Sequence, residues 1–245
     1  MNNPYLRCGA HARIRYDSIL GCIHFDNITV LDVGCGIGQL GKIIESKKNA
    51  SVVFLDIKLG HLKRIKNGKR VCADGAMLPF KDYSFDYVVS SDALEHIPLS
   101  ARRSFINEMI RVTRKSLLLT FSTVSAYTYG GQVFRKWLNH LHISHPNSYR
   151  EHSEFPTSVD EIEHLLIKRD INVIFTKSYQ GIISLSLWIL GMKLGKLEKW
   201  SKKRKHSPTL VLRISGFLVN SIGYLLLKAF DFPPHFSFFI YASKK

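Results

Sequence analysis

Residues 30–38 read Val-Leu-Asp-Val-Gly-Cys-Gly-Ile-Gly, an apolar strand followed at once by three alternating glycines. The apolar spacing then changes to that of a helix over residues 39–44. Glycine tolerates the left-handed backbone of a tight turn and lets backbone N–H groups come close to a ligand. This junction predicts a parallel α/β sheet that holds a nucleotide-like ligand at its first turn. The motif alone is weak, because glycine turns also serve plain packing.

A second apolar run over residues 52–55 ends in Asp56, which lies 18 positions after Gly38. In nucleotide-binding βαβ units, an acid at about this distance accepts hydrogen bonds from the ribose hydroxyls. The alternative is an ordinary loop acid or a helix cap. The glycines follow the pattern Gly-x-Gly-x-Gly, without the Gly-x-x-Gly step that seats a pyrophosphate on a helix. The pattern therefore argues against a nicotinamide cofactor.

Two further blocks follow in order. Residues 71–80 read Val-Cys-Ala-Asp-Gly-Ala-Met-Leu-Pro-Phe, and residues 84–98 join an apolar strand to Asp-Ala-Leu-Glu-His-Ile-Pro. In order and spacing, these blocks resemble the class I S-adenosylmethionine-dependent methyltransferases. The resemblance is greatest to the group that holds quinone-biosynthesis, small-molecule and lipid enzymes. It covers residues 28–123 densely and the final strand loosely.

The resemblance implies that five residues surround the methionine part of S-adenosylmethionine. Gly34, Cys35 and Gly36 form the turn beneath it. Asp32 braces that turn and reaches the amino group through backbone or water. Ser91 ends the fourth strand next to the sulfonium.

Five other residues are implied to hold the adenosine part of the cofactor. Asp56 accepts hydrogen bonds from the ribose hydroxyls, and Ile57 packs on the adenine. Asp74 accepts a hydrogen bond from the adenine amine, while Gly75 and Ala76 lie beside the ring.

The resemblance also implies one α/β domain, with a Rossmann-like sheet that is mostly parallel and has an antiparallel last strand. We expect strands at 28–33, 51–56, 69–72, 85–91, 116–122, 171–179 and 236–243, and helices that begin near Gly38, Leu59, Leu99 and Ser158. The expected parts are a helical N-terminal cap (1–27), a cofactor-binding half (28–123), an acceptor-side half (124–181), a helical insertion (182–235) and the last strand (236–243).

The insertion is the main departure from a minimal methyltransferase, in which a short link joins the last two strands. Its apolar stretches 182–200 and 209–230 flank four consecutive cations at 202–205. A helical hairpin in the interface of an anionic membrane fits this pattern best. The alternatives are a pocket lid or dimer surface, and a pair of spanning helices. Spanning is disfavoured because the first stretch is short, Arg213 interrupts the second and the basic turn would lie outside.

The net charge of +16 predicts attraction to an anionic partner: nucleic acid, anionic lipid or an acidic substrate. Residues 58–70 carry six cations and no acid. For this first cluster, the favoured interpretation is a solvated helical face. A second basic cluster lies within the insertion, where the neighbouring apolar stretches favour a membrane surface.

Residues for the chemical step are weakly encoded, because a methyl-transfer base has no common motif. His96 follows the fourth strand, and His152 precedes the helix near 158, so both are candidate bases. The alternative for His96 is a turn cap or packing beneath the cofactor. We expect no metal; the alternative is a divalent ion on Asp92, Glu95 and His96, which could share one helical face.

The sequence therefore predicts methyl transfer from S-adenosylmethionine to a small or lipid-linked acceptor, by O- or C-methylation, at a membrane surface. RNA methylation is the alternative that the charge favours, but Ser90-Ser91-Asp92-Ala93 stands where an Asn-Pro-Pro-Tyr-type block would be. A third hypothesis is a catalytically silent scaffold with the methyltransferase fold. The presence of Asp56 and Asp74 argues against it, because a scaffold need not keep a cofactor site. With no visible secretory signal and no disulfide-like cysteine pattern, we expect a cytoplasmic protein, peripheral on the inner face of the membrane. The acceptor and the oligomeric state are not encoded.

Overall fold

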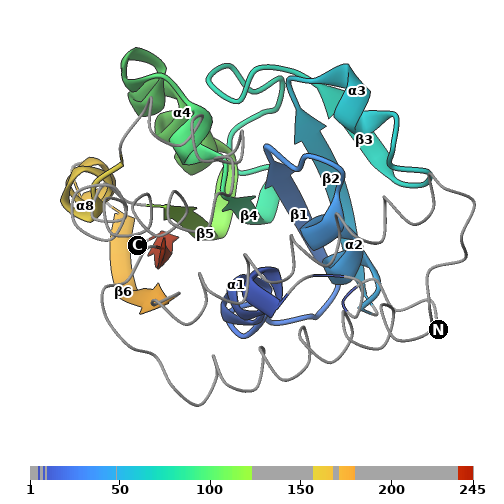
Figure 1. Ribbon diagram of the computed structural model, residues 1–245, viewed down its shortest axis with the longest axis horizontal. Helices are drawn as coiled ribbons and strands as arrows, with labels where there is room; N and C mark the ends of the chain where they lie inside the picture. The colour runs from blue at the N-terminus through green and yellow to red at the C-terminus, as the bar shows by residue number, and fades with distance from the viewer. Residues whose placement is uncertain are drawn as a thin grey trace, which may run out of the picture.

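The computed structural model describes residues 5, 8, 10–47, 49–122, 157–167, 171–179 and 237–244. They form a seven-stranded sheet in the order β3-β2-β1-β4-β5-β7-β6 (Figure 1). The strands are β1 (Ile28–Val33), β2 (Ala50–Asp56), β3 (Lys69–Cys72), β4 (Phe85–Ser91), β5 (Thr113–Ser122), β6 (Ile171–Tyr179) and β7 (Ser237–Lys244). β1 to β5 run parallel, whereas β7 lies antiparallel between β5 and β6. The predicted Rossmann-like sheet with an antiparallel last strand is confirmed.

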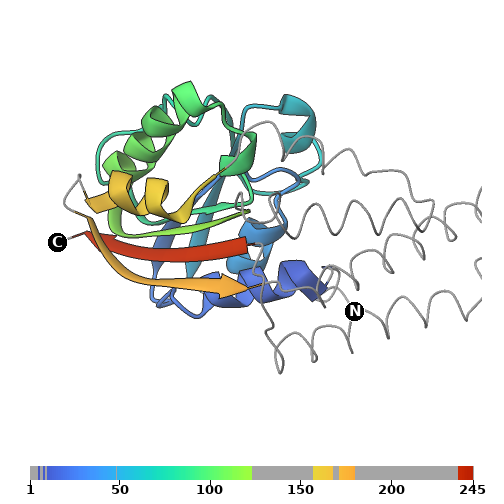
Figure 2. The ribbon, with the colours of Figure 1, turned by 60° about the vertical axis from the view of Figure 1, so that its left-hand side comes forward.

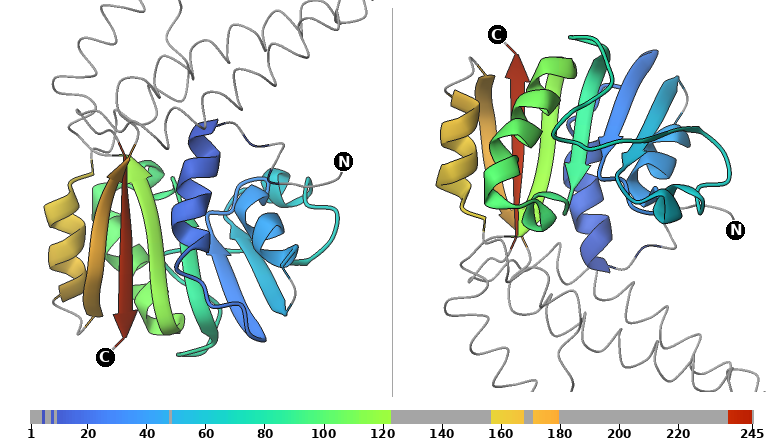
Figure 3. Two further views of the ribbon diagram at one scale, coloured as in Figure 1. Left: turned by 90° about the horizontal axis from the view of Figure 1, so that it is seen from below. Right: turned by 90° about the horizontal axis from the view of Figure 1, so that it is seen from above.

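Helices cover both faces of this sheet (Figure 3). α4 (Leu99–Val112) and α8 (Val159–Ile167) pack on one face, and α1 (Ala10–Leu20) and α2 (Gln39–Glu45) pack on the other. The short α3 (Leu59–Leu62) follows β2, and the 3₁₀ helix η2 (Leu94–His96) follows β4. At one edge, β6 and β7 run side by side with α8 next to them (Figure 2). α2, α3, α4 and α8 begin within one residue of their predicted positions.

The hydrophobic core is divided into two clusters by the sheet. Along β1, Val30 joins the cluster beneath α1 and α2, whereas Leu31 and Val33 join the cluster beneath α4. A strand buried on both faces has apolar side chains at successive positions instead of alternate ones. This explains why the central strands were predictable as continuous apolar runs.

Two interpretations of the sequence need correction. β5 begins at Thr113, three residues before the predicted start, because the Thr113 hydroxyl donates to the Met109 carbonyl at 2.6 Å and α4 runs directly into the strand. The basic segment 58–70 is not a helical face. α3 has only four residues, and the chain continues through a loop into β3, the edge strand of the sheet.

The predicted insertion at 182–235 and most of the acceptor-side half, including His152, lie outside the described residues. Among the helices that the structure describes, none is long and apolar enough to cross a membrane.

Candidate cofactor site

The turn after β1 depends on glycine for two separate reasons. Gly34 and Gly36 have φ values of 69° and 55°, in the left-handed region that L-residues rarely adopt. A Cβ on Gly34 would lie 2.7 Å from the Cβ of Ala93, so the turn packs closely against the segment after β4. A Cβ on Gly36 would meet nothing within 4 Å, so this backbone faces open space. The turn therefore has one packed side and one side available to a ligand.

Asp56, the last residue of β2, fixes this turn through its carboxylate. Oδ2 accepts a hydrogen bond from the Gly36 N–H at 2.8 Å, and Oδ1 accepts one from the Lys58 N–H at 2.7 Å. His61 Nδ1 lies 3.3 Å from Oδ1. Since each carboxylate oxygen has two lone pairs, Asp56 keeps acceptor capacity for ligand hydroxyls while it holds the turn.

Asp32 fixes the helix that follows this turn, from inside the core. Its Oδ2 accepts a hydrogen bond from the Gly41 N–H at 3.0 Å, in the first part of α2. The side chain is buried, and this burial raises the pKa of Asp32 to about 7, with a smaller contribution from the charge of Asp56. The structure thus shows Asp32 bonded to α2, and its role at the turn itself stays a prediction.

A cavity of about 620 Å³ opens beyond the carboxyl ends of the parallel strands. This volume lies within the range of about 300–1,000 Å³ that is typical of small-molecule sites. Most of the predicted cofactor residues line it, namely Gly34, Cys35, Gly36, Asp56, Ile57, Asp74, Gly75 and Ser91. Asp32 and Ala76 do not, although Ala76 belongs to the loop that carries Asp74.

The loop that carries Asp74 is shaped by its own hydrogen bonds and by α4. Asp74 Oδ1 accepts from the Ala76 N–H at 2.8 Å, and the side chain is exposed. A Cβ on Gly75 would lie 2.3 Å from the ring of Phe105, so only glycine lets the loop pass this close to α4.

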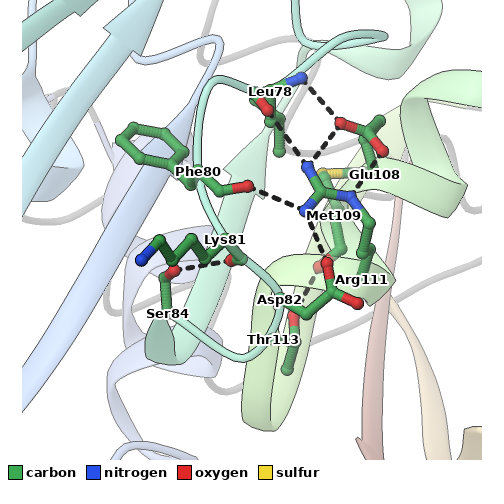
Figure 4. A network of polar contacts seen from close by, with 9 residues as sticks. All are labelled: Leu78, Phe80, Lys81, Asp82, Ser84, Glu108, Met109, Arg111 and Thr113. Carbon is green, nitrogen blue, oxygen red and sulfur yellow. Dashed lines mark hydrogen bonds and ion pairs between the residues drawn. The ribbon is translucent and has the colours of Figure 1, made fainter.

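Further along, Arg111 of α4 fastens the same loop (Figure 4). Its guanidinium donates to the carbonyls of Leu78 and Phe80 at 3.0 and 2.7 Å, and Glu108 accepts from the Leu78 N–H at 2.7 Å. The hydrogen bond from Arg111 keeps the pKa of Glu108 below its usual value. α4 therefore sets the position of the cavity wall that contains Asp74 and Gly75.

The segment after β4 brings Asp92 and His96 to the cavity. Asp92 has a φ of 53° and forms an ion pair with Arg15 of α1. The left-handed backbone at Asp92 turns the chain before η2 starts at Leu94.

The alternative metal set, Asp92 with Glu95 and His96, is wrong as a helical face. Asp92 lies outside η2, and Glu95 is only 1% exposed and does not line the cavity. In the part of the chain that the structure describes, no three His, Cys, Asp or Glu side chains lie close enough to hold a metal ion. Burial, followed by the charge of Asp92, raises the pKa of Glu95 to about 8.

Several residues of the cavity wall were not predicted from the sequence. Tyr16 of α1 lines the cavity, and its hydroxyl donates to Gln39 Oε1 at 3.4 Å. Burial raises the pKa of the Tyr16 hydroxyl to about 12. Phe105 and His61 also line the cavity. The predicted N-terminal cap gave the region that supplies Tyr16, but nothing in its local pattern distinguished this tyrosine from the other residues of the helix.

The comparisons with known proteins agree with this geometry. Residues 31–120 match a family described as a methyltransferase domain. A 2-methyl-6-phytyl-1,4-hydroquinone methyltransferase of Synechocystis is 35% identical over 98 residues, which are 37% of this chain and 30% of that protein. An uncharacterized protein of Methanocaldococcus jannaschii is 42% identical over 69 residues, 28% of this chain and 29% of that one. The chain spans less than half the length of these curated relatives.

Among solved structures, a cyclopropane synthase of Mycobacterium tuberculosis superposes with a TM-score of 0.62 at 14% identity, covering 100% of this chain and 95% of that chain. At this identity the likeness shows the fold alone. Together, the matched domain, the strand order and the glycine turn show that the domain matched by residues 31–120 belongs to the class I S-adenosylmethionine-dependent methyltransferases.

Proposed function

We propose that this chain transfers the methyl group of S-adenosylmethionine to a small or lipid-linked acceptor, by O- or C-methylation. The observation that carries the proposal is the carboxylate of Asp56, which closes the glycine turn and lines the cavity at the same time. Gly36 leaves open space on the ligand side of that turn. An adenosine ribose placed there would find an anionic acceptor and open space beside Gly36.

The charge of the cavity wall also fits this cofactor. S-adenosylmethionine carries a cationic sulfonium and an ammonium group, and the wall holds three carboxylates, Asp56, Asp74 and Asp92. Lys58 is the one lysine or arginine in the wall as the structure describes it. A site with this balance attracts a cation more strongly than an anion such as a pyrophosphate.

The cofactor, when bound, supplies a methyl group activated by the sulfonium, and its leaving group is a neutral thioether. The protein then has to place the acceptor in line and exclude water. Ser91, Asp92 and His96 line the cavity at the end of β4, where we place the acceptor side. We assign to His96 the removal of a proton from the acceptor, should that acceptor be a hydroxyl.

We further propose that the acceptor is reached at the cytoplasmic surface of a membrane. The support is the composition of residues 182–230, whose apolar stretches flank four consecutive cations. The relative from Synechocystis is named for a phytyl hydroquinone, a lipid-like acceptor, which agrees with this class.

The test starts with the cofactor and ends with the acceptor. Calorimetry should detect binding of S-adenosylmethionine and of S-adenosylhomocysteine to the purified chain. The protein should then be incubated with methyl-labelled cofactor and, in parallel, with a lipid extract and an aqueous extract of cells. We expect label in the organic phase of the incubation with lipid extract. Absence of binding to both compounds would remove the methyltransferase proposal, whereas label confined to water-soluble products would remove only the lipid-linked acceptor.

A further inference from the structure

The edge of the sheet that carries α3 and β3 has an unusual charge distribution. Six cations are exposed here, and no acid occurs between residues 57 and 73. They are Lys58, Lys63, Arg64, Lys66, Lys69 and Arg70, which we call the basic edge. In Figure 1 this edge lies at the far side of the sheet from α8 and β6.

Several exposed or partly buried arginines and lysines elsewhere in the described residues have acidic partners. Lys42 pairs with Glu45 at 2.7 Å, and Arg111 pairs with Glu108 at 2.7 Å. Within the described ranges, none of the six cations of the basic edge forms an ion pair with an aspartate or glutamate. Like charges held together without counter-charges repel one another, so this surface suits an anionic partner.

Protection of a sheet edge explains only part of this pattern. Cations on an outer strand prevent pairing with other chains, and Lys69 and Arg70 on β3 serve that purpose. Lys63, Arg64 and Lys66 lie outside the strand, in the loop between α3 and β3. A separate reason is needed for these three.

The same surface exposes aliphatic side chains. Ile57 is 64% exposed, Leu59 is 53% exposed and Ile37 is 44% exposed. Ile37 and Ile57 line the cavity together with Lys58, so two of these aliphatic residues and one cation of the basic edge meet at the cavity. Single-stranded RNA is bound through stacked aromatic side chains, and residues 57–70 contain no phenylalanine, tyrosine or tryptophan. Aliphatic residues beside lysine and arginine are instead typical of surfaces that enter the interface of an anionic membrane.

We propose that the basic edge docks the protein on anionic lipid headgroups, with Leu59 entering the interface and the cavity mouth turned toward the lipid. The inference rests on the proposed function for its purpose, because a lipid-linked acceptor would then enter the cavity directly from the membrane. It concerns residues 58–70 and uses no residue of the insertion at 182–230.

The test compares two triple variants of the full chain in vesicle co-sedimentation. Lys63→Glu, Arg64→Glu and Lys66→Glu change the basic edge, and Lys47→Glu, Lys81→Glu and Arg103→Glu make the same change of charge on exposed residues outside it. On vesicles of phosphatidylcholine with phosphatidylglycerol, the edge variant should bind at least about tenfold more weakly than wild type, since each cation at an anionic surface contributes to affinity. The control variant should bind within about threefold of wild type, because its sites lie outside the basic edge.

A single variant separates lipid from nucleic acid. Leu59→Asn should weaken binding to these vesicles and leave binding to a single-stranded RNA oligonucleotide unchanged, because only lipid offers an apolar phase. An equal loss of vesicle binding in the two triple variants would overturn the proposal. So would an edge variant that binds RNA more weakly than wild type but binds vesicles equally well. If wild type binds no vesicle, both this surface and the membrane location fail. Calorimetry with S-adenosylhomocysteine on every variant reports the cofactor site and folding independently.

Discussion

Asp56 Oδ2 accepts a hydrogen bond from the Gly36 N–H at 2.8 Å, which ties the end of β2 to the turn after β1. One carboxylate therefore shapes the glycine turn and lines the cavity that the turn borders. Loss of this side chain should affect cofactor binding twice, through the missing acceptor and through a loosened turn.

Asp56→Ala should lower the affinity for S-adenosylmethionine at least tenfold, because a hydrogen bond to a charged group contributes about 1.5–3 kcal/mol. Asp86 provides a matched control. It is also buried and accepts from a backbone N–H, that of Thr29 at 2.9 Å, but it lies outside the cavity. Asp86→Ala should lower the melting temperature and leave affinity unchanged. Calorimetric affinity equal to wild type in Asp56→Ala would remove Asp56 from the site.

A second prediction concerns pH. Burial raises the pKa of Asp32 to about 7 from an ordinary value of 3.8. Between these values the folded protein holds a proton that the unfolded chain has released. The contribution of Asp32 to stability is therefore complete below about pH 4 and is lost as the pH rises through about 7.

Asp32→Asn removes this titration. The melting temperature of the variant minus that of wild type should be larger at pH 8 than at pH 5, by at least about 2 °C. Scanning calorimetry without cofactor at the two pH values measures the difference, and Glu95 contributes equally to both proteins. A difference between the proteins that stays constant with pH would show that Asp32 does not titrate in this range.

The parts of the fold predicted from sequence are those set by local pattern. Both faces of β1 are buried, so its apolar run and the following glycines predicted strand and turn together. Tyr16 reaches the cavity only because α1 packs against the sheet, a tertiary relation that no local pattern contains. The alternative metal set assumed that helix spacing extends back to Asp92, whereas the left-handed backbone there ends that spacing.

A third prediction concerns Arg102, which is completely buried in α4. It donates to the carbonyls of Leu94 and Ile97 at 3.4 and 3.3 Å and pairs with Glu161 of α8 at 3.1 Å. Arg102→Met should cost about 1–3 kcal/mol in the free energy of unfolding, because it removes the hydrogen bonds to two carbonyls and the ion pair with Glu161. Urea unfolding measures this value, and the exposed neighbour Arg103, changed to Met, is the control. Equal stability of the two variants would contradict a structural role for Arg102.

A fourth prediction concerns the insertion, which lies outside the described residues. Changing the four cations at 202–205 to glutamate should strongly reduce co-sedimentation with anionic vesicles, since each contributes about 1 kcal/mol at such a surface. Added salt should weaken wild-type binding without abolishing it, because the apolar contribution is not screened. Complete release by salt would show that the apolar stretches at 182–200 and 209–230 do not enter the lipid.

The last prediction separates chemistry from binding at His96. If His96 removes a proton from the acceptor, His96→Ala should lower turnover by about 10²–10⁴-fold, the usual contribution of a general base. Affinity for S-adenosylmethionine should stay within about twofold, since the residue lies on the acceptor side at the end of β4. His61 lines the same cavity beside Asp56 and gives the opposite control. His61→Ala should weaken cofactor binding and leave turnover at saturating cofactor close to wild type. Turnover unchanged in His96→Ala would assign the step to positioning alone, as expected for a carbon acceptor that needs no base.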